Sequence, residues 1–360
     1  MENLSNYLDL SDTNPLHASL PYPEGISGIL KTSPSYDPDP QGLLTAREAV
    51  SAEFTRQGLE IAPGDILLTS GTSEAYSLIF KVLSNPGDRI GYPVPGYPLL
   101  EHLVASEGLE PYPYLLSSDN WGLDRNDFPG DGNCSAWVAI SPHNPTGTFL
   151  TPEDRRFFAE TSAVNGAALV MDEVFVDYAW ENRPVRPENA SPCLTFHLGG
   201  LSKSCGLPQL KCSWIGVRGP ESEKNEAVQR LSFLADQYLS VGMPVQQALP
   251  SILGGVGPDI RKMILSRIQS NRQAILEYLA PYAGKIRSCA SQGGWNLLLK
   301  VQIPSRNDEE TALELLKQGV WMMPGSLFDF EEPGYWVVSL LTETAKLSMG
   351  LLKALPLLAG

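Results

Sequence analysis

The chain has 360 residues, 42% of them hydrophobic, and a formal net charge of -15. An acidic surface repels nucleic acid and anionic lipid, so we expect no nucleic-acid partner and no membrane association. The first residues show no charged-then-apolar signal segment, and no apolar run is long enough to span a bilayer. Five scattered cysteines without CxxC spacing indicate reduced thiols, no metal site and a cytoplasmic location.

Short apolar strands alternate with helices through the middle of the chain. We expect strands at residues 65–69, 89–91, 137–141, 168–172, 193–198 and 213–217, and helices at 73–83 and 152–164. This alternation predicts an α/β fold, with a large domain built on a mostly parallel, doubly wound sheet. Ligands of such sheets bind at the carboxyl ends of the strands, where the polar motifs of this chain fall.

The pattern changes after residue 251. A long amphipathic helix is expected at 258–279, helices at 309–318 and 345–355, and strands at 286–288, 296–301, 320–322 and 336–341. These elements predict a smaller α+β domain. We expect residues 37–250 to form the large domain, and residues 1–36 and 251–360 to form the small one.

The first polar motif links the strand at 65–69 to the helix at 73–83. It contains Gly71, Thr72 and Ser73, whose hydroxyls and free backbone N–H groups at a helix start would bind an anion. An ordinary helix cap by Thr72 or Ser73 explains the same residues, so both interpretations stay open.

The second motif is the loop 141–147, Ser-Pro-His-Asn-Pro-Thr-Gly. Asn144 follows one proline closely and precedes another, and its side-chain amide can donate to a phenolic oxygen. A simple turn is the alternative, because Asn-Pro and Thr-Gly are turn dipeptides. We expect His143 to be a structural histidine of this loop and not a catalytic base.

The third motif places Asp172 directly after an apolar strand. A buried carboxylate is costly unless a cation or strong donors face it, so Asp172 is a candidate partner for a cationic ligand group. A helix cap or a structural salt bridge is the alternative.

The fourth motif is the loop 199–211, which contains Lys203 and Lys211. A lysine among small residues at a sheet edge can be dehydrated and lose its proton, as a nucleophilic lysine requires. Lys211 could supply positive charge to a phosphate, although both lysines could also be solvent-exposed. We expect Cys205 to be a packing residue, since no base is evident near it.

In their order and spacing, these four motifs resemble those of the class I/II aminotransferases, the fold-type I enzymes that use pyridoxal 5'-phosphate (PLP). The resemblance implies that Lys203 is the Schiff-base lysine and proton carrier. It implies that Asp172 pairs with the pyridine nitrogen of PLP and that Asn144 contacts the ring oxygen. Gly71, Thr72, Ser73 and Lys211 match the phosphate-binding residues of the family.

The same resemblance implies further contacts and a partner. Tyr97, in Pro-Gly-Tyr-Pro, matches the aromatic residue that stacks on the cofactor ring, although a turn aromatic is the alternative. Tyr36 matches a tyrosine that reaches the phosphate across a dimer interface, and Ser240 is aligned with a similar role. A homodimer with shared active sites is therefore expected.

The sequence departs from the family pattern at several positions. Phe175, in the cofactor-binding set, stands where many relatives have a tyrosine, and Gly200 where many have a serine on the phosphate. Lys211 replaces a more usual arginine. Val337 stands where the family places the arginine for the substrate α-carboxylate, with Lys300 as a speculative substitute for that charge. Ala235 stands at the second carboxylate-binding arginine of the aspartate enzymes, which argues against a dicarboxylic substrate held in their manner.

The resemblance implies an aminotransferase that takes a small amino donor and a 2-oxo acid. Another PLP reaction on the same fold, a decarboxylase or a carbon–sulfur lyase, is the alternative, because the motif residues do not separate these reactions. A non-catalytic PLP-binding regulator is a third class. The short N-terminal segment and the acidic charge oppose it.

Overall fold

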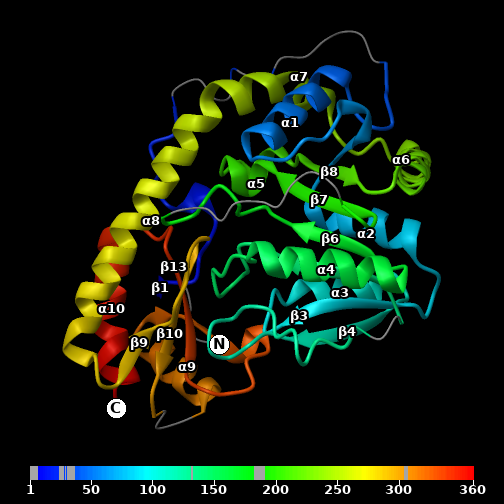
Figure 1. The fold of residues 1–360 in the computed structure, drawn as a ribbon. Coiled ribbons are helices and arrows are strands. Elements are labelled where there is room, and N and C mark those ends of the chain that lie inside the picture. The colour runs from blue at the N-terminus through cyan, green and yellow to red at the C-terminus, as the bar shows by residue number, and fades with distance from the viewer. Residues whose placement is uncertain are drawn as a thin grey trace.

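The computed structural model describes residues 7–23, 28, 30, 37–130, 133–181, 191–303 and 307–360. Its largest sheet has the strand order β2-β8-β7-β6-β5-β3-β4 (Figure 1). The strands are β2 (Ile66–Thr69), β3 (Arg89–Val94), β4 (Glu110–Leu115), β5 (Cys134–Ile140), β6 (Ala168–Asp172), β7 (Thr195–Gly200) and β8 (Ser213–Arg218). β8 is antiparallel to its neighbours β2 and β7, and the other pairs are parallel. The expected mostly parallel sheet is confirmed.

Both faces of this sheet are apolar and covered by helices. Successive side chains of a strand point to opposite faces, so Val170 packs in one apolar cluster and Met171 in another. One face packs on α2 (Thr72–Leu83), α3 (Leu99–Ser106) and α6 (Glu221–Asp236). The other packs on α4 (Pro152–Asn165) and, beside β2 and β8, on α1 (Leu44–Arg56) and α7 (Met243–Ser251). The sheet is therefore doubly wound, as expected.

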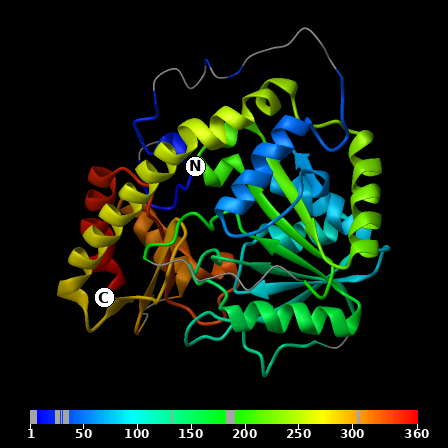
Figure 2. The same ribbon diagram turned by 45° about the horizontal axis from the view of Figure 1, so that its top comes forward.

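The C-terminal part carries a second, antiparallel sheet of order β12-β13-β10-β9. Its strands are β9 (Ile286–Ser288), β10 (Asn296–Val301), β12 (Met323–Pro324) and β13 (Tyr335–Ser339), accompanied by α9 (Asp308–Lys317) and α10 (Thr344–Leu358). The long helix α8 (Gly257–Leu279) runs from α7 toward this sheet and packs on α10 (Figure 1, Figure 2). Near the N-terminus, β1 (Leu8–Asp9) pairs with β11 (Val320–Trp321). None of the described helices is both long and apolar enough to cross a bilayer.

Some expected element boundaries were wrong, and several elements were not expected. The strand expected at 193–198 is Thr195–Gly200, and the one expected at 320–322 ends a residue earlier as β11, with β12 beginning only at Met323. The strand expected at 336–341 begins and ends earlier, at Tyr335–Ser339. β4 was missed because Pro111 and Pro113 disfavour a strand, yet β4 lies at the edge of the sheet, where proline is tolerated. The helices α1, α3, α6 and α7 were also missed.

Candidate active site

The polar motifs of the sequence meet at one edge of the seven-stranded sheet. The carboxyl ends of β2, β5, β6 and β7 lie at this edge, beside the first residue of the antiparallel strand β8. A cavity of about 190 Å³ opens there. It is lined by Thr13, Thr72, Tyr97, Ile140, Asn144, Asp172, Val174, Phe175, Gly200, Ser202, Lys203, Ser213 and Asn296. Six of the residues singled out as cofactor-binding therefore share one cavity.

Lys203 lies in the short helix α5 (Leu201–Ser204), directly after β7. Its Nζ lies 5.1 Å from the ring centroid of Trp295 and 5.6 Å from that of Phe175. Burial lowers the pKa of this ammonium group, and the nearby charge of Asp172 opposes the shift. Lys203 is thus not a solvent-exposed lysine, and its surroundings favour the neutral amine.

Hydrogen bonds hold the backbone around Lys203. The hydroxyl of Tyr178 donates to the carbonyl oxygens of Lys203 (2.9 Å) and Ser204 (3.1 Å). Ser204 Oγ in turn donates to the carbonyl of Gly200 at 2.9 Å. Because α5 has only one turn, these contacts fix the direction from which Lys203 enters the cavity.

Asp172 is the last residue of β6, and its side chain is buried. Its carboxylate accepts hydrogen bonds from the Tyr76 hydroxyl at 2.8 Å and from the Val174 backbone N–H at 3.2 Å. Burial raises the pKa of Asp172, and these two donors counteract the shift. Within the described residues, Asp172 has no ion pair. The salt bridge considered for this position is made instead by Glu173, with Arg155 at 3.0 Å.

Asn144 and Tyr97 approach the cavity from two loops. Asn144 Oδ1 accepts a hydrogen bond from Asn296 Nδ2 on β10 at 2.9 Å, which leaves the amide group of Asn144 as a donor. Tyr97 is 40% exposed, and burial, followed by the charge of Asp172, raises the pKa of its hydroxyl. Its loop is tied to the C-terminal part by the Gly96 N–H, which donates to the carbonyl of Phe328 at 2.9 Å.

The start of α2 and Lys211 form the remaining end of the site. Gly71 is the N-cap of α2 and makes no side-chain cap, so the alternative of a cap by Thr72 or Ser73 is wrong. Lys211 Nζ lies 3.4 Å from the point that a Cβ on Gly71 would occupy. Thr72 lines the cavity, whereas Ser73 is exposed and does not. A helix N-terminus and an ammonium group therefore stand together, as an anion site requires.

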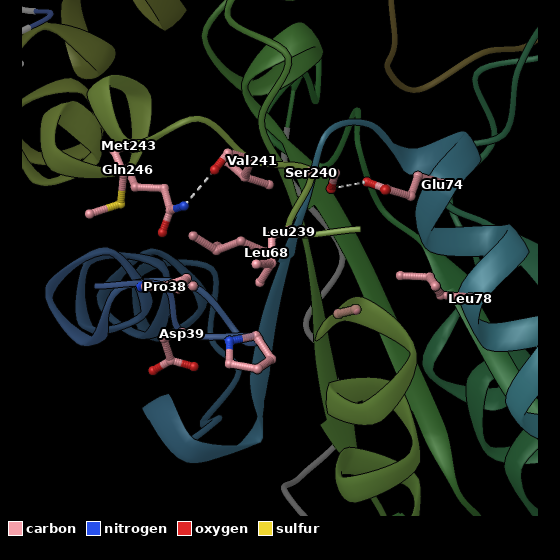
Figure 3. Close-up of a pocket in the computed structure, with 13 residues that line it drawn as sticks. Pro38, Asp39, Leu68, Glu74, Leu78, Leu239, Ser240, Val241, Met243 and Gln246 are labelled. Carbon is pink, nitrogen blue, oxygen red and sulfur yellow. Dashed lines mark hydrogen bonds between the residues drawn. The ribbon is translucent and has the colours of Figure 1, made fainter. Parts of the chain in front are cut away.

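Ser240 does not line this cavity. Its hydroxyl donates to Glu74 Oε2 of the same chain at 2.9 Å, beside a separate small pocket that includes Asp39 and Gln246 (Figure 3). Glu74 also accepts from the backbone N–H of Ser70 at 2.5 Å. Tyr36 lies outside the described residues.

The residue that the family pattern aligns with a carboxylate-binding arginine has an apolar environment. Val337 is 2% exposed and packs with Trp121, Leu298 and Phe330, among others. Lys300 does not line the cavity. Its Nζ lies 3.0 Å from Glu332 and 3.8 Å from the ring centroid of Tyr335, so it is a paired lysine at the end of a strand.

Sequence reasoning missed five residues of the site: Thr13, Tyr76, Trp295, Asn296 and Ser213. Tyr76 lies on the buried face of α2, and nothing in the local pattern indicates that its hydroxyl reaches Asp172. Asn296 carried a weak signal, because a polar amide opens an otherwise apolar strand. Trp295 is a buried ring whose contact with Lys203 depends on the packing of β10 against the large sheet.

These groups match the parts of PLP. The buried amine of Lys203 has no hydrogen bond to any described protein group, and an aldehyde carbon would engage it. The carboxylate of Asp172 has no cationic partner among the described residues, and a protonated ring nitrogen would be such a partner. The start of α2 with Lys211 suits a phosphate, and Tyr97 offers an aromatic face. Fold and site together define a fold-type I PLP enzyme.

Comparison with known proteins identifies the family. Residues 33–347 match the family described as aminotransferase class I and II. The glutamate-pyruvate aminotransferase AlaA of Haemophilus influenzae is 26% identical over 98% of this chain and 90% of its own length. The S-alkyl-thiohydroximate lyase SUR1 of Arabidopsis thaliana is 31% identical over 61% of this chain and 49% of its own.

A solved alanine aminotransferase from Pyrococcus furiosus has a similar fold, with a TM-score of 0.88, 24% identity, and coverage of 97% of this chain and 91% of that one. The chain belongs to the aminotransferase class I and II family, and it is a PLP-dependent aminotransferase.

His143 provides a test of the electrostatics beside the site. It is buried, with Nδ1 2.9 Å from Thr146 Oγ1, and burial lowers its pKa to about 3. The unfolded chain, with a histidine pKa of about 6.5, then binds more protons between about pH 6.5 and pH 3. Stability should therefore fall as the pH drops through this window, by about 1.4 kcal/mol for each pH unit.

We expect His143→Gln to flatten this dependence when urea unfolding of the apoprotein is compared at about pH 8 and about pH 5.5. Between these two pH values, the free energy of unfolding of the variant should fall by about 1 kcal/mol less than that of the wild type. His102→Gln, at an exposed histidine, is the matched control and should leave the dependence unchanged. An equal loss in wild type and His143→Gln would contradict a neutral, buried His143.

Proposed function

We propose that Lys203 binds PLP covalently and carries the proton at the substrate carbon during amino transfer to a 2-oxo acid. The observation that carries this proposal is the buried amine of Lys203 in the cavity that also contains Asp172. When bound, PLP supplies an electron sink through its ring. The role of the protein is to hold that ring and to exclude water around Lys203.

The other cavity residues have distinct roles in this proposal. Asp172, held by Tyr76, keeps the ring nitrogen protonated, and Asn144 donates to the ring oxygen while Asn296 orients it. Tyr97 stacks on the ring. Phe175 packs beside Lys203 as an apolar group and, unlike a tyrosine, cannot donate a hydrogen bond to the ring oxygen.

The phosphate end of the site has its own set of residues. We assign the phosphate to the N-terminus of α2, at Gly71, Thr72 and Ser73, and to the ammonium group of Lys211. Backbone N–H groups at a helix start and a point charge bind phosphate without a guanidinium fork.

Borohydride reduction followed by peptide mapping should find the cofactor on Lys203. We expect Lys203→Ala to abolish this label and to lower kcat by about 100-fold or more, since a positioned acid–base group contributes about that factor. Lys81→Ala is the matched control, because Lys81, on α2, is paired with Glu107 away from the cavity, and it should leave both label and rate unchanged. A label on Lys211 or Lys81 would refute the assignment.

A second activity at the same site has one specific observation in its favour. The similarity to a protein named as a thiohydroximate lyase supports carbon–sulfur bond cleavage as the second candidate. Transamination converts the donor to its carbonyl product, a 2-oxo acid from an amino acid or an aldehyde or ketone from an amine, and makes an amino acid from an added 2-oxo acid. A lyase instead releases a thiol without consuming the acceptor, so product analysis separates the two.

We further propose that the substrate is not held by an arginine–carboxylate pair. Val337 fills the usual arginine position with an apolar side chain. In the described part of the chain, Lys203 is the only basic residue that lines the cavity, and the neutral donors that line it are Thr13, Thr72, Tyr97, Asn144, Ser202, Ser213 and Asn296. An amine, or a modified amino acid without a free α-carboxylate, fits this lining better than a dicarboxylic acid.

A kinetic comparison of common α-amino acids with their amides and matched amines tests this proposal. A missing hydrogen bond to a charged group removes about 1.5–3 kcal/mol of preference for the carboxylate. We therefore expect kcat/KM for amides or amines to equal or exceed that of the acids. A fast α-amino acid whose amide is inert would contradict this expectation.

We propose a homodimer as the active unit, with Tyr36 and Ser240 near the phosphate site of the partner. Support comes from exposed apolar side chains in the segment that precedes Ser240: Phe233 is 71% exposed and Tyr238 is 62% exposed. Association would remove this surface from water.

Sedimentation should give twice the 39.2 kDa chain mass, and Phe233→Glu should shift the protein toward monomers of lower activity. Leu352→Glu, at an exposed leucine on α10, should leave the dimer intact. A fully active monomer at assay concentration would refute the dimer.

The domain division and location also belong to the proposal. We propose a large domain of residues 37–250 and a small domain of residues 1–36 and 251–360. The strands of the seven-stranded sheet fall in the first range, those of the four-stranded sheet fall in the second, and the β1–β11 pair links the N-terminal segment to the small domain. We propose a cytoplasmic location because the five cysteines are free.

A further inference from the structure

Gly200 and Ser213 face each other across two neighbouring strands. Gly200 is the last residue of β7, and Ser213 is the first residue of β8 and its partner in the antiparallel register. Ser213 is also paired with Thr69, the last residue of β2, which leads into the start of α2. Ser213 therefore lies between the segment that contains Lys203 on one side and the helix start that contains Gly71 on the other.

The two positions have room for only one side chain. Directly opposed residues of an antiparallel pair point to the same face of the sheet. A Cβ on Gly200 would collide with Ser213 Oγ and would lie 2.9 Å from Ser213 Cβ. A serine at position 200, where many relatives place a phosphate-binding hydroxyl, is thus incompatible with Ser213 in this rotamer.

The Ser213 hydroxyl is buried and open to the cavity. Ser213 is 2% exposed, and it lines the cavity together with Thr72, Gly200 and Lys203. No described protein group forms a hydrogen bond with its Oγ. A buried hydroxyl without a protein partner is costly unless a ligand or water satisfies it.

We propose that Ser213 donates its hydroxyl to the phosphate of PLP and so replaces the hydroxyl that Gly200 lacks. In this proposal the phosphate-binding hydroxyl belongs to β8 instead of β7, and it still lies between α2 and Lys203. This inference rests on the proposed function, because it assumes that PLP occupies the cavity with its phosphate at the start of α2.

The test compares the affinity of the apoenzyme for PLP with its affinity for pyridoxal, which lacks the phosphate. We expect Ser213→Ala to weaken PLP binding by about 10- to 100-fold, the range for losing one hydrogen bond to a charged group, while pyridoxal binding stays unchanged. Ser232→Ala, on α6 and bonded only to the carbonyl of Val228, is the matched control and should change neither affinity.

A double variant that exchanges the residues at positions 200 and 213, here called the swapped pair, gives a second test. Gly200→Ser alone should weaken PLP binding because it crowds Ser213. Combined with Ser213→Gly it should restore affinity to within about threefold of the wild type, since one hydroxyl again faces the phosphate. An unchanged ratio of PLP to pyridoxal affinity in Ser213→Ala would overturn the proposal, as would a swapped pair no tighter than Ser213→Gly.

Failure of this proposal is distinguishable from failure of the proposed function. If PLP still attaches to Lys203 by borohydride mapping, but Ser213→Ala binds it as tightly as the wild type does, only the role of Ser213 is wrong. If the wild-type apoenzyme binds no PLP at all, the proposed function fails, and this inference fails with it.

Discussion

The site depends on burying an amine and a carboxylate in one cavity without pairing them. Lys203 and Asp172 both line the cavity, but no ion pair joins them in the described structure. Burial disfavours the charged form of each, lowering the pKa of the lysine and raising that of the aspartate. A closed salt bridge would satisfy both groups and leave neither available. Keeping them apart leaves each in need of a ligand.

Hydrogen bonds from nearby groups offset part of the free-energy cost of burying Asp172. Asp172 receives the Tyr76 hydroxyl from α2 and the Val174 N–H from its own turn, which satisfies part of a buried carboxylate without neutralising it. The next residue, Glu173, has the opposite environment, with Arg155 and His197 each 3.0 Å from one of its oxygens. Two adjacent carboxylates therefore differ in environment: Glu173 ties β6 to its surroundings, and Asp172 is the carboxylate that we propose for the ring nitrogen of PLP.

The sequence predicted those features that depend on local pattern. β6 was located at its observed bounds because it is an uninterrupted apolar run ending in Asp172, and the loop with Asn144 was recognised by its prolines. Contacts between distant segments could not be predicted. The bonds from Tyr76 to Asp172 and from Asn296 to Asn144 join residues 96 and 152 positions apart. β4 was missed because its prolines are tolerated only at a sheet edge, and the strand order is a tertiary property.

Different elements build the two sides of the cavity. Asp172 and Ser213 are end residues of strands in the seven-stranded sheet, and Thr72 and Lys203 lie in the helices that follow β2 and β7, so the register of this sheet positions all four. Asn296 comes from β10 of the smaller sheet, and Thr13 from the N-terminal segment. Val337, on the strand next to β10, is paired with Leu298 and Met323 and buried in an apolar cluster. If Val337 is aligned with the family's arginine as we propose, the exchange changes packing within the smaller sheet and leaves the strand ends of the larger sheet untouched. In the proposed function, substrate preference can thus change without disturbing the Lys203 amine and the Asp172 carboxylate to which we assign the chemistry.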